Sequence, residues 1–246
     1  MTTVLIMAGG RSDRMRSSLG PTHKAMVPIL GVPMIERNIC SLLAKRIRRI
    51  IVAINAQERE IEAYVRERGA ELVARVGGTI ECLHEEQPLG TIGAVTELRD
   101  LTDQVLVTNV DNLTTLDWEA LLGYHRQIRP AMTIAAHRTS FRIPFGELEV
   151  VGHRVLAYHE KPAKKVLISS GSYVLSPVTC GLLPKGQKAD VPDLVKLLID
   201  SGKPIAAFEH QSVWIDVNDA GSVAEGERLI STNSRDFEYV GIRQLR

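Results

Sequence analysis

Basic side chains and paired glycines gather in one short segment near the N-terminus. Residues 8–24 begin with the run AGGRSDR and hold Arg11, Arg14, Arg16 and Lys24 against a single acid, which gives them a local charge of +3. The glycines let backbone N–H groups approach phosphate oxygens closely, and the cations would neutralise phosphate charge. This composition predicts a polyphosphate-binding loop; the alternative is a solvated surface loop that holds arginine by chance.

Two aspartates follow apolar runs further along the chain. Asp111 comes after residues 104–110, and Asp216 comes after residues 213–215. Carboxylate oxygens suit Mg²⁺, which proteins bind through one or two carboxylates together with phosphate oxygens. The two aspartates are 105 positions apart, so only the fold can bring them together. A turn or helix-cap aspartate is the alternative for each.

The composition places any such site in an ordinary globular protein. The 246 residues are 44% hydrophobic and 24% charged, which argues against disorder and against disulfide-rich scaffolds. Thirty Lys and Arg against 29 Asp and Glu leave a net charge of +1, so no bulk field would hold nucleic acid or an acidic membrane. The N-terminus carries no basic run ahead of its short apolar stretch, and no apolar stretch approaches the ~18 residues of a membrane helix, so we expect neither a signal peptide nor a membrane span. The three cysteines, Cys40, Cys82 and Cys180, show no metal-ligand spacing and favour reduced thiols in a cytoplasmic protein.

Apolar β-branched runs alternate with amphipathic stretches in the first half of the chain, the pattern of a mainly parallel sheet covered by helices. The candidate central strands are residues 3–7, 49–54 and 104–110. Helices with one apolar face are expected over residues 33–44 and 58–68, the second ending at Gly69. Both would be crossover connections between parallel strands.

The second half of the chain changes character, because short strands follow one another with few helices between them. The candidate strands are residues 131–137, 145–150, 155–159 and 171–175. They favour a small antiparallel extension of the sheet. Helices are expected over residues 194–200, which Asp190 and Asp193 precede, and over residues 219–230, which begin with Asp219. We predict one domain over residues 1–232 and a C-terminal tail over residues 233–246.

Two common phosphate-binding motifs do not fit the N-terminal segment, which matches neither G-x-x-x-x-G-K-[ST] nor G-x-G-x-x-G. The segment instead resembles the first loop of the sugar-1-phosphate nucleotidylyltransferases, which reads approximately A-G-G-x-G-T-R-L followed by P-K-P-M. The residues that stand in the corresponding order are Ala8, Gly9, Gly10, Arg14 and Lys24.

Five more segments resemble motifs of that family, in the family's order. They are residues 85–94 (EEQPLGTIGA), 109–111 (NVD), 145–147 (FGE), 160–162 (EKP) and 214–216 (WID). The resemblance covers about residues 2–230. Departures fall on Ser12 and Asp13, on His23 and Ala25 around the lysine, and on residues 169–171. They bear on loop shape and on the choice of substrate rather than on activity, because the charged positions are intact.

The resemblance implies a single Rossmann-like nucleotidyltransferase domain of the α/β class, with a mixed, mainly parallel central sheet and a small antiparallel extension. It implies an enzyme that forms an NDP-sugar and pyrophosphate from an NTP and a sugar 1-phosphate, with Mg²⁺. In this reaction a sugar phosphate oxygen attacks the α-phosphorus in line, so catalysis consists mostly of positioning and charge neutralisation. Hexapeptide repeats are absent from the sequence, so we do not expect the β-helix that some members carry.

The same resemblance implies roles for individual residues, each of which could otherwise be an ordinary surface or turn position. The catalytic cations are Arg14 and Lys24, toward the triphosphate, and Lys161, toward the sugar phosphate. The metal ligands are Asp111 and Asp216. The nucleotide-binding positions are Ala8, Gly9, Gly10, Arg11, Glu85, Pro88 and Gly90. The sugar-phosphate-binding positions are Asn112, Gly146, Glu160, Lys161, Ser169 and Gly171.

Glu85 bears on the choice of base. It lies five residues before Gly90, where thymidylyl and uridylyl members of the family place a glutamine that pairs with the pyrimidine. An ionised carboxylate only accepts hydrogen bonds, and guanine offers two adjacent donors, so we expect GTP with a mannose- or heptose-type 1-phosphate. The alternatives are UTP, dTTP, CTP or ATP with another sugar, such as glucose 1-phosphate, and the adjacent Glu86 competes for the same role.

Two further functions remain open. The acceptor could be a non-sugar phosphate, although the EKP and WID segments favour a sugar. The chain could also be an inactive regulatory homologue that binds sugar nucleotides, although its intact cations and aspartates favour an enzyme. The expected partners are the NTP and the sugar 1-phosphate, without nucleic acid or membrane, and a homo-oligomer is left open.

Overall fold

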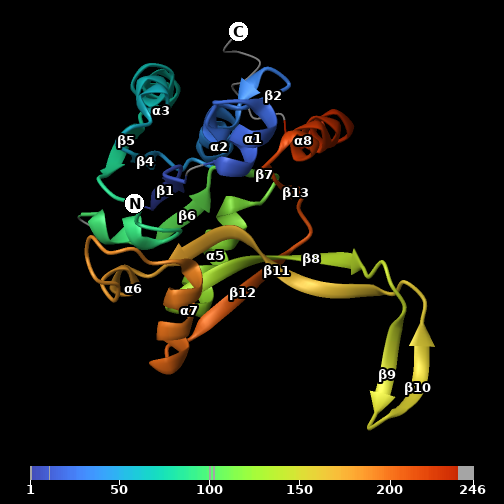
Figure 1. The fold of residues 1–246 in the computed structure, drawn as a ribbon. Helices are drawn as coiled ribbons and strands as arrows, with labels where there is room; N and C mark the ends of the chain where they lie inside the picture. Colours follow the sequence, from blue (N-terminus) through green and yellow to red (C-terminus); the bar gives the residue numbers. More distant parts are fainter. Residues whose placement is uncertain (1, 11, 100, 102, 238–246) are drawn as a thin grey trace.

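The structure, a computed structural model, describes residues 2–10, 12–99, 101 and 103–237. They build a seven-stranded sheet with the order β12-β8-β11-β6-β1-β4-β5 and helices on both faces (Figure 1). Strand β11 runs antiparallel to its two neighbours, and the other six strands share one direction. The predicted mixed, mainly parallel sheet is confirmed.

The strands of the large sheet include the three predicted central ones. Their bounds are β1 Thr3–Met7, β4 Arg49–Asn55, β5 Thr79–Glu85, β6 Val105–Asn109, β8 Met132–Arg142, β11 Ala163–Leu175 and β12 Ile205–His210. Six shorter strands form three pairs: β2 Pro28–Ile29 with β3 Val32–Pro33, β7 Asn112–Thr114 with β13 Trp214–Asp216, and β9 Glu147–Val151 with β10 Arg154–His159.

Two layers of helices cover the sheet. One face carries α2 Met34–Ala44, α3 Arg59–Tyr64, α4 Ala70–Ala74 and α5 Trp118–Ile128. The other face carries η3 Gly93–Glu97, α6 Pro177–Cys180 and α7 Val191–Asp200. Successive residues of a strand point to opposite faces, so Val4 and Ile6 enter the first core while Leu5 and Met7 enter the second. No helix within the described residues is long and apolar enough to cross a membrane.

A third, smaller core joins distant parts of the chain at one edge of the sheet. It lies between α1 Asp13–Leu19, α8 Ala220–Thr232 and the β2 segment, with Met15, Ile29 and Ile230 among its buried residues. Phe237 is also buried there. The predicted tail therefore packs on the domain as far as residue 237, and the predicted boundary at residue 232 stays a prediction.

Two local predictions were wrong. Gly69 does not end its helix, because the chain continues through the π-helical turn η2 Val65–Gly69 into α4. Gly69 has helical backbone angles, and its lack of a side chain admits Ile80, whose Cδ1 would lie 3.2 Å from a Cβ at this position. The segment over residues 8–24 is also not a loop throughout, since α1 follows its glycines and is anchored by the buried Met15.

The predicted antiparallel extension is present, and it projects away from the body of the molecule (Figure 1). Strand β8 pairs with β12 only as far as His137, and beyond that point it pairs with β11 alone. The β9–β10 hairpin continues from the far end of this ribbon. We call residues 138–167 the arm.

Candidate functional site

Segments that the sequence singled out meet at the carboxyl edge of the sheet. The in-register parallel pairing places Met7 of β1 beside Asn109 of β6, so the residues after both strands emerge together. They are Gly9 and Gly10 after β1 and Asp111 after β6. Ligands of open α/β sheets bind in the crevice outside the carboxyl ends of the strands, which makes this edge the candidate site.

Lys24 and Asp111 form an ion pair in this crevice. The Lys24 Nζ lies 2.5 Å from Oδ2 of Asp111. Asp111 is only 5% exposed, and its second oxygen, Oδ1, is buried without a hydrogen-bond partner among the described residues. A buried carboxylate oxygen without a partner is costly, so it indicates a place for a cation or a donor from a ligand.

The β7–β13 pairing brings Asp216 to the same place. Asp216 lies opposite Asn112 in the ladder, and the Val217 N–H donates to the carbonyl oxygen of Asp111 at 2.9 Å. Partial burial and the nearby Asp111 raise the pKa of Asp216 from 3.8 to about 6, while Lys24 and Arg14 act in the opposite direction. Two aspartates far apart in the sequence therefore sit close enough to repel each other.

This pair of carboxylates fits a divalent cation. Asp111 offers a buried unpartnered oxygen, and the repulsion between the two carboxylates would be relieved by positive charge between them. Within the described ranges no cluster of three or more His, Cys, Asp or Glu side chains could hold a metal. The protein would thus supply two carboxylates, and phosphate oxygens or water would complete the coordination, as is usual for Mg²⁺.

His23 positions Lys24, a role that the sequence did not predict. Its Nδ1 accepts the Ala25 N–H at 3.1 Å, so the proton resides on Nε2, which donates to the carbonyl oxygen of Gly10 at 2.8 Å. Burial lowers the pKa of His23, so the ring is neutral, as this tautomer requires. His23 thereby ties the glycine turn to the short 3₁₀ helix η1 Lys24–Met26. In the sequence it was visible only as a departure from the family's proline.

The predicted residues of the first loop take different places. Ala8 is buried, and its N–H donates to the carbonyl oxygen of Ala53 at 2.8 Å, which fixes the start of the turn to β4. Gly10 is exposed at the crevice beside the Lys24 side chain. Arg14 lies exposed on α1, close enough to Asp216 for its charge to lower the pKa of that carboxyl group. Arg11 lies outside the described residues.

Glu85, at the end of β5, lies over Gly9. A Cβ on Gly9 would come within 2.8 Å of the Glu85 carboxylate, so only glycine fits there. Glu85 is 2% exposed, its Oε2 accepts the Leu89 N–H at 3.1 Å, and its Oε1 is buried without a partner among the described residues. Burial raises the pKa of this carboxyl group. Like Asp111, Glu85 presents one oxygen that only a ligand or water could satisfy.

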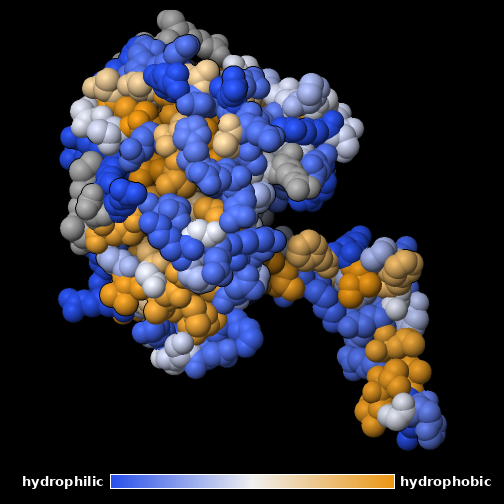
Figure 2. All heavy atoms as spheres, turned by 60° about the vertical axis from the view of Figure 1, so that its left-hand side comes forward, coloured by the Kyte–Doolittle hydropathy of each residue, from blue (hydrophilic) through white to orange (hydrophobic). Residues whose placement is uncertain are grey.

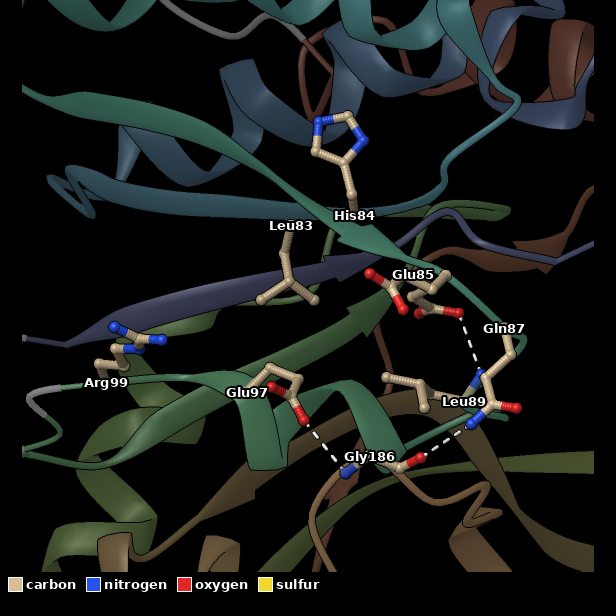
Figure 3. Close-up of a pocket in the computed structure, with 9 residues that line it drawn as sticks. Leu83, His84, Glu85, Gln87, Leu89, Glu97, Arg99 and Gly186 are labelled. Carbon is tan, nitrogen blue, oxygen red and sulfur yellow. Dashed lines mark hydrogen bonds between the residues drawn. The ribbon is translucent and has the colours of Figure 1, made fainter.

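A pocket of about 530 Å³ opens beside Glu85 (Figure 3). Leu83 and Leu89 supply apolar surface, and Glu97 and Arg99 line the side remote from Glu85. Gly186 closes the pocket, since its N–H donates to Glu97 at 3.1 Å and its carbonyl oxygen accepts from Gln87 at 3.1 Å. The pocket combines apolar walls with one buried acceptor, which suits a planar heterocycle.

Gly90 and Pro88 shape the loop that follows this pocket. Gly90 has φ +81°, and a Cβ there would come within 2.5 Å of the Ala189 carbonyl oxygen. The next N–H, that of Thr91, donates to Asp190 at 2.9 Å and fixes the loop to the start of α7. Packing thus requires glycine at position 90, while Pro88 is exposed. Their roles in nucleotide binding stay predictions.

Three of the predicted sugar-phosphate residues lie at the crevice. Asn112 donates through Nδ2 to the Gly171 carbonyl oxygen at 3.0 Å. Gly171 has φ +70°, and a Cβ there would come within 2.8 Å of Asn112 and 3.0 Å of Asn109, so only glycine permits this contact. Ser169 donates to the Tyr173 hydroxyl oxygen at 3.0 Å.

The other three, Gly146, Glu160 and Lys161, lie on the arm. The Tyr158 hydroxyl donates to Glu160 at 3.1 Å, and its ring packs so closely on Gly146 that a Cβ would clash. The Lys161 side chain is 58% exposed, with Glu160 as its neighbour at 3.9 Å. Strand β11 begins at Ala163, two residues after Lys161, and at about 3.3 Å per residue it separates Ala163 from Ser169 by about 20 Å. The structure does not bring these three residues to the carboxylates.

Comparison with known proteins identifies relatives over most of the chain. The family model described as nucleotidyl transferase matches residues 3–233. A putative mannose-1-phosphate guanyltransferase of Sulfolobus acidocaldarius is 24% identical over 88% of this chain and 60% of its own length. A UTP–glucose-1-phosphate uridylyltransferase of Synechocystis is 27% identical over 97% of this chain and 66% of its own length. The chain thus spans about 60 to 66% of these curated relatives.

Solved structures share the fold. HddC from Yersinia pseudotuberculosis, solved alone and in complex with GMP-PN, superposes with a TM-score of 0.71 at 22% identity and covers 94% of this chain and 100% of its own. A putative glucose-1-phosphate thymidylyltransferase from Bacillus anthracis gives a TM-score of 0.72 at 18% identity, over 93% of this chain and 95% of its own. At these identities the likeness establishes the Rossmann-like architecture.

Proposed function

We propose, from the premise that the chain belongs to the nucleotidyl transferase family, that it forms an NDP-sugar and pyrophosphate from an NTP and a sugar 1-phosphate. The observation that carries this proposal is the cluster of Lys24, Asp111 and Asp216 at the carboxyl edge of the sheet. The cluster joins a cation to two close carboxylates, one of which has a buried free oxygen. We assign the activity to residues 1–232.

Asp111 and Asp216 would hold a divalent cation, Mg²⁺ in this proposal. When bound, it would neutralise phosphate charge and polarise the α-phosphate toward attack. Mg²⁺ retains several water or phosphate ligands and needs few from the protein, which agrees with a site of two carboxylates.

Lys24 would stabilise the charge of the nucleotide. With a cation bound to Asp111, its ammonium group would be free to turn from that carboxylate to the phosphates. His23 holds the backbone of Lys24 against the glycine turn, so this charge stays aimed at the crevice. Arg14 would add a second positive charge from α1. Pyrophosphate leaves as an anion, and fixed cations lower the cost of that step without reorganising.

The base would enter the pocket beside Glu85. We propose GTP, because the free Oε1 of Glu85 can accept from guanine N1–H and from the guanine amino group, and neither uracil nor adenine offers two such adjacent donors. Pairing with these donors would stabilise the ionised carboxylate that burial disfavours. A mannose- or heptose-type 1-phosphate is the proposed acceptor, with Asn112 and Gly171 on its side of the crevice.

A matrix of NTPs against sugar 1-phosphates, scored by pyrophosphate release, tests this function. We expect release with Mg²⁺, no release after chelation with EDTA, and the highest kcat/KM with GTP. Amino-alcohol phosphates in the same matrix test the non-sugar acceptor. If no combination releases pyrophosphate, the chain is not the proposed enzyme. A preference for another NTP would overturn only the assignment of the base.

A further inference from the structure

The arm holds most of the large hydrophobic side chains that are exposed in the described part of the chain. Nine of the fifteen large hydrophobic side chains that are exposed among the described residues lie on it: Phe141, Phe145, Leu148, Val150, Val151, Val155, Leu156, Tyr158 and Leu167. Figure 2 shows groups of hydrophobic residues, in orange, along the lobe that projects from the body. A soluble monomer rarely exposes a continuous apolar region of this kind, so the arm is expected to be covered.

The hairpin of the arm has one apolar face and one polar face. Across its ladder, Leu148 lies opposite Tyr158 and Val150 lies opposite Val155, so these four side chains share a face. The other face carries charge, including Glu149, which pairs with His159 at 2.9 Å. An isolated two-stranded hairpin is at best marginally stable in water, so an uncovered apolar face calls for a packing partner.

The arm also separates residues that the proposed function needs in one place. It leaves the sheet at the edge that holds the site, because β8 runs in the same direction as β6. Lys161 then lies just beyond Ala163, the start of β11, which is about 20 Å along the ribbon from Ser169. Within one chain, the arm therefore places Lys161 away from the crevice where Asn112 and Gly171 lie.

We propose that the arm packs on a second copy of this chain and delivers Lys161 and Glu160 to the sugar-phosphate side of the partner's site. The role given to Lys161 rests on the proposed function. Two-fold symmetry would satisfy both arms and both sites at once. The arm has 30 residues, matching the roughly 20 to 30 residues that each side of a standard interface of about 800 Å² per partner provides.

Charge complementarity favours this occupant. The arm carries six Lys and Arg against three Glu, a net charge of +3 in a chain of +1. The crevice of the second copy holds Lys24 and Arg14 beside the carboxylates of Asp111 and Asp216, so the negative charge that would attract the arm comes from the NTP and sugar phosphate of the proposed function. A basic arm would therefore be attracted to the substrate-loaded site of another copy while its apolar face is buried.

Sedimentation of the full chain tests the interface. The wild type should form a dimer, and Val150→Asp should weaken the dimer at least about tenfold, because it places a carboxylate on the apolar face. Val151→Asp is the matched control, since its side chain lies on the opposite face, beside Arg154. The two valines are 50% and 67% exposed, so neither change should lower the melting temperature of the body. A wild type that stays monomeric, or two variants that behave alike, would overturn the proposal.

Mixing two impaired variants tests the exchange of Lys161. Asp111→Asn spoils the crevice but keeps the arm, and Lys161→Ala spoils the arm but keeps the crevice. Mixed dimers from equal amounts would unite one intact crevice with one intact arm. About a quarter of the wild-type rate should return, because half of the dimers are mixed and each has one complete site of two.

The outcomes of the mixing experiment separate this proposal from the proposed function. If mixed dimers form and no activity returns while the wild type is active, Lys161 does not act across the dimer, and the exchange is overturned. This is also the result expected if the arm folds back over its own site. If the wild type itself releases no pyrophosphate, the proposed function fails, and the Val150 and Val151 variants decide the interface alone.

Discussion

Only one of the two carboxylate oxygens of Asp111 has a partner among the described residues. Oδ2 pairs with Lys24, and the buried Oδ1 has no hydrogen-bond partner. Asp111→Asn keeps the shape of the side chain and removes its charge, so turnover should fall about 10² to 10³-fold, or about 3 to 4 kcal/mol in transition-state stabilisation. Pyrophosphate release measures this loss. Asp117→Asn is the matched control, because Asp117 also pairs with a lysine, Lys45 at 3.3 Å, but caps α5 away from the crevice. A loss below about threefold for Asp111→Asn would contradict its role.

In the absence of a bound cation, the ionised side chain of Asp216 lowers the stability of the folded protein. Its pKa lies near 6 in the fold and near 3.8 in the unfolded chain, so the native state binds more protons between these values and becomes less stable as pH rises through them. Asp216→Asn should therefore raise the melting temperature of the metal-free protein at pH 8 and leave it nearly unchanged at pH 4, while activity falls. Thermal unfolding at the two pH values checks this. An equal shift at both would show that the buried charge of Asp216 is not the cause.

Glu85 offers a direct test of the base. Glu85→Gln replaces an acceptor-only group with an amide that both donates and accepts, which matches uracil or thymine. The ratio of kcat/KM for GTP over UTP should fall by about 10 to 100-fold. Glu86→Gln is the control, since Glu86 is exposed and should leave the ratio unchanged. If the Glu86 variant changes the ratio and the Glu85 variant does not, the alignment of the loop is off by one residue.

At this scale the sequence singled out Lys24, Asp111 and Asp216, which the structure brings together. Their chemical roles stay predictions. The sequence did not predict His23. A buried histidine that works through one tautomer looks the same in a sequence as an exposed one, and only the hydrogen bonds to Gly10 and Ala25 in the fold distinguish them.

The short helix η1 is the element that aims Lys24, and His23 caps it. His23→Ala removes two hydrogen bonds, each worth about 1 kcal/mol net, so unfolding should become easier by about 2 kcal/mol. Because the Lys24 charge would then be less well aimed, kcat should fall more than KM rises. Denaturant unfolding and steady-state kinetics check the two effects. If His23 has only a structural role, His23→Ala will lower stability and leave the kcat of the folded fraction unchanged.

Strands β1, β4 and β6 could be predicted because both of their faces are buried and they form continuous apolar runs. Strands β5 and β12 lie at the two edges of the sheet, where alternate residues are exposed, and their sequences lack such runs. The β7–β13 pair has three residues on each side and depends on partners about a hundred positions apart. Long-range pairing of this kind leaves no local pattern, although it is what unites the two aspartates.

At the scale of the whole molecule, the sequence indicated an antiparallel extension without its direction. Alternating apolar residues predict strands, but whether their apolar face lies on the body or in solvent depends on the path of the chain after β8. The projecting arm is therefore a finding of the structure, and it divides the motif residues expected in one crevice into one group at the crevice and one group on the arm.

A time course of both products is the most direct test of nucleotidyl transfer at the crevice of Lys24, Asp111 and Asp216. With Mg²⁺, GTP and mannose 1-phosphate, or whichever pair the substrate matrix favours, we predict that pyrophosphate and nucleotide-sugar accumulate in equal amounts in the wild type. Neither product should accumulate after chelation with EDTA, and both should accumulate far more slowly in Asp111→Asn. Pyrophosphate without nucleotide-sugar, or equal rates in the wild type and the Asp111 variant, would contradict the account.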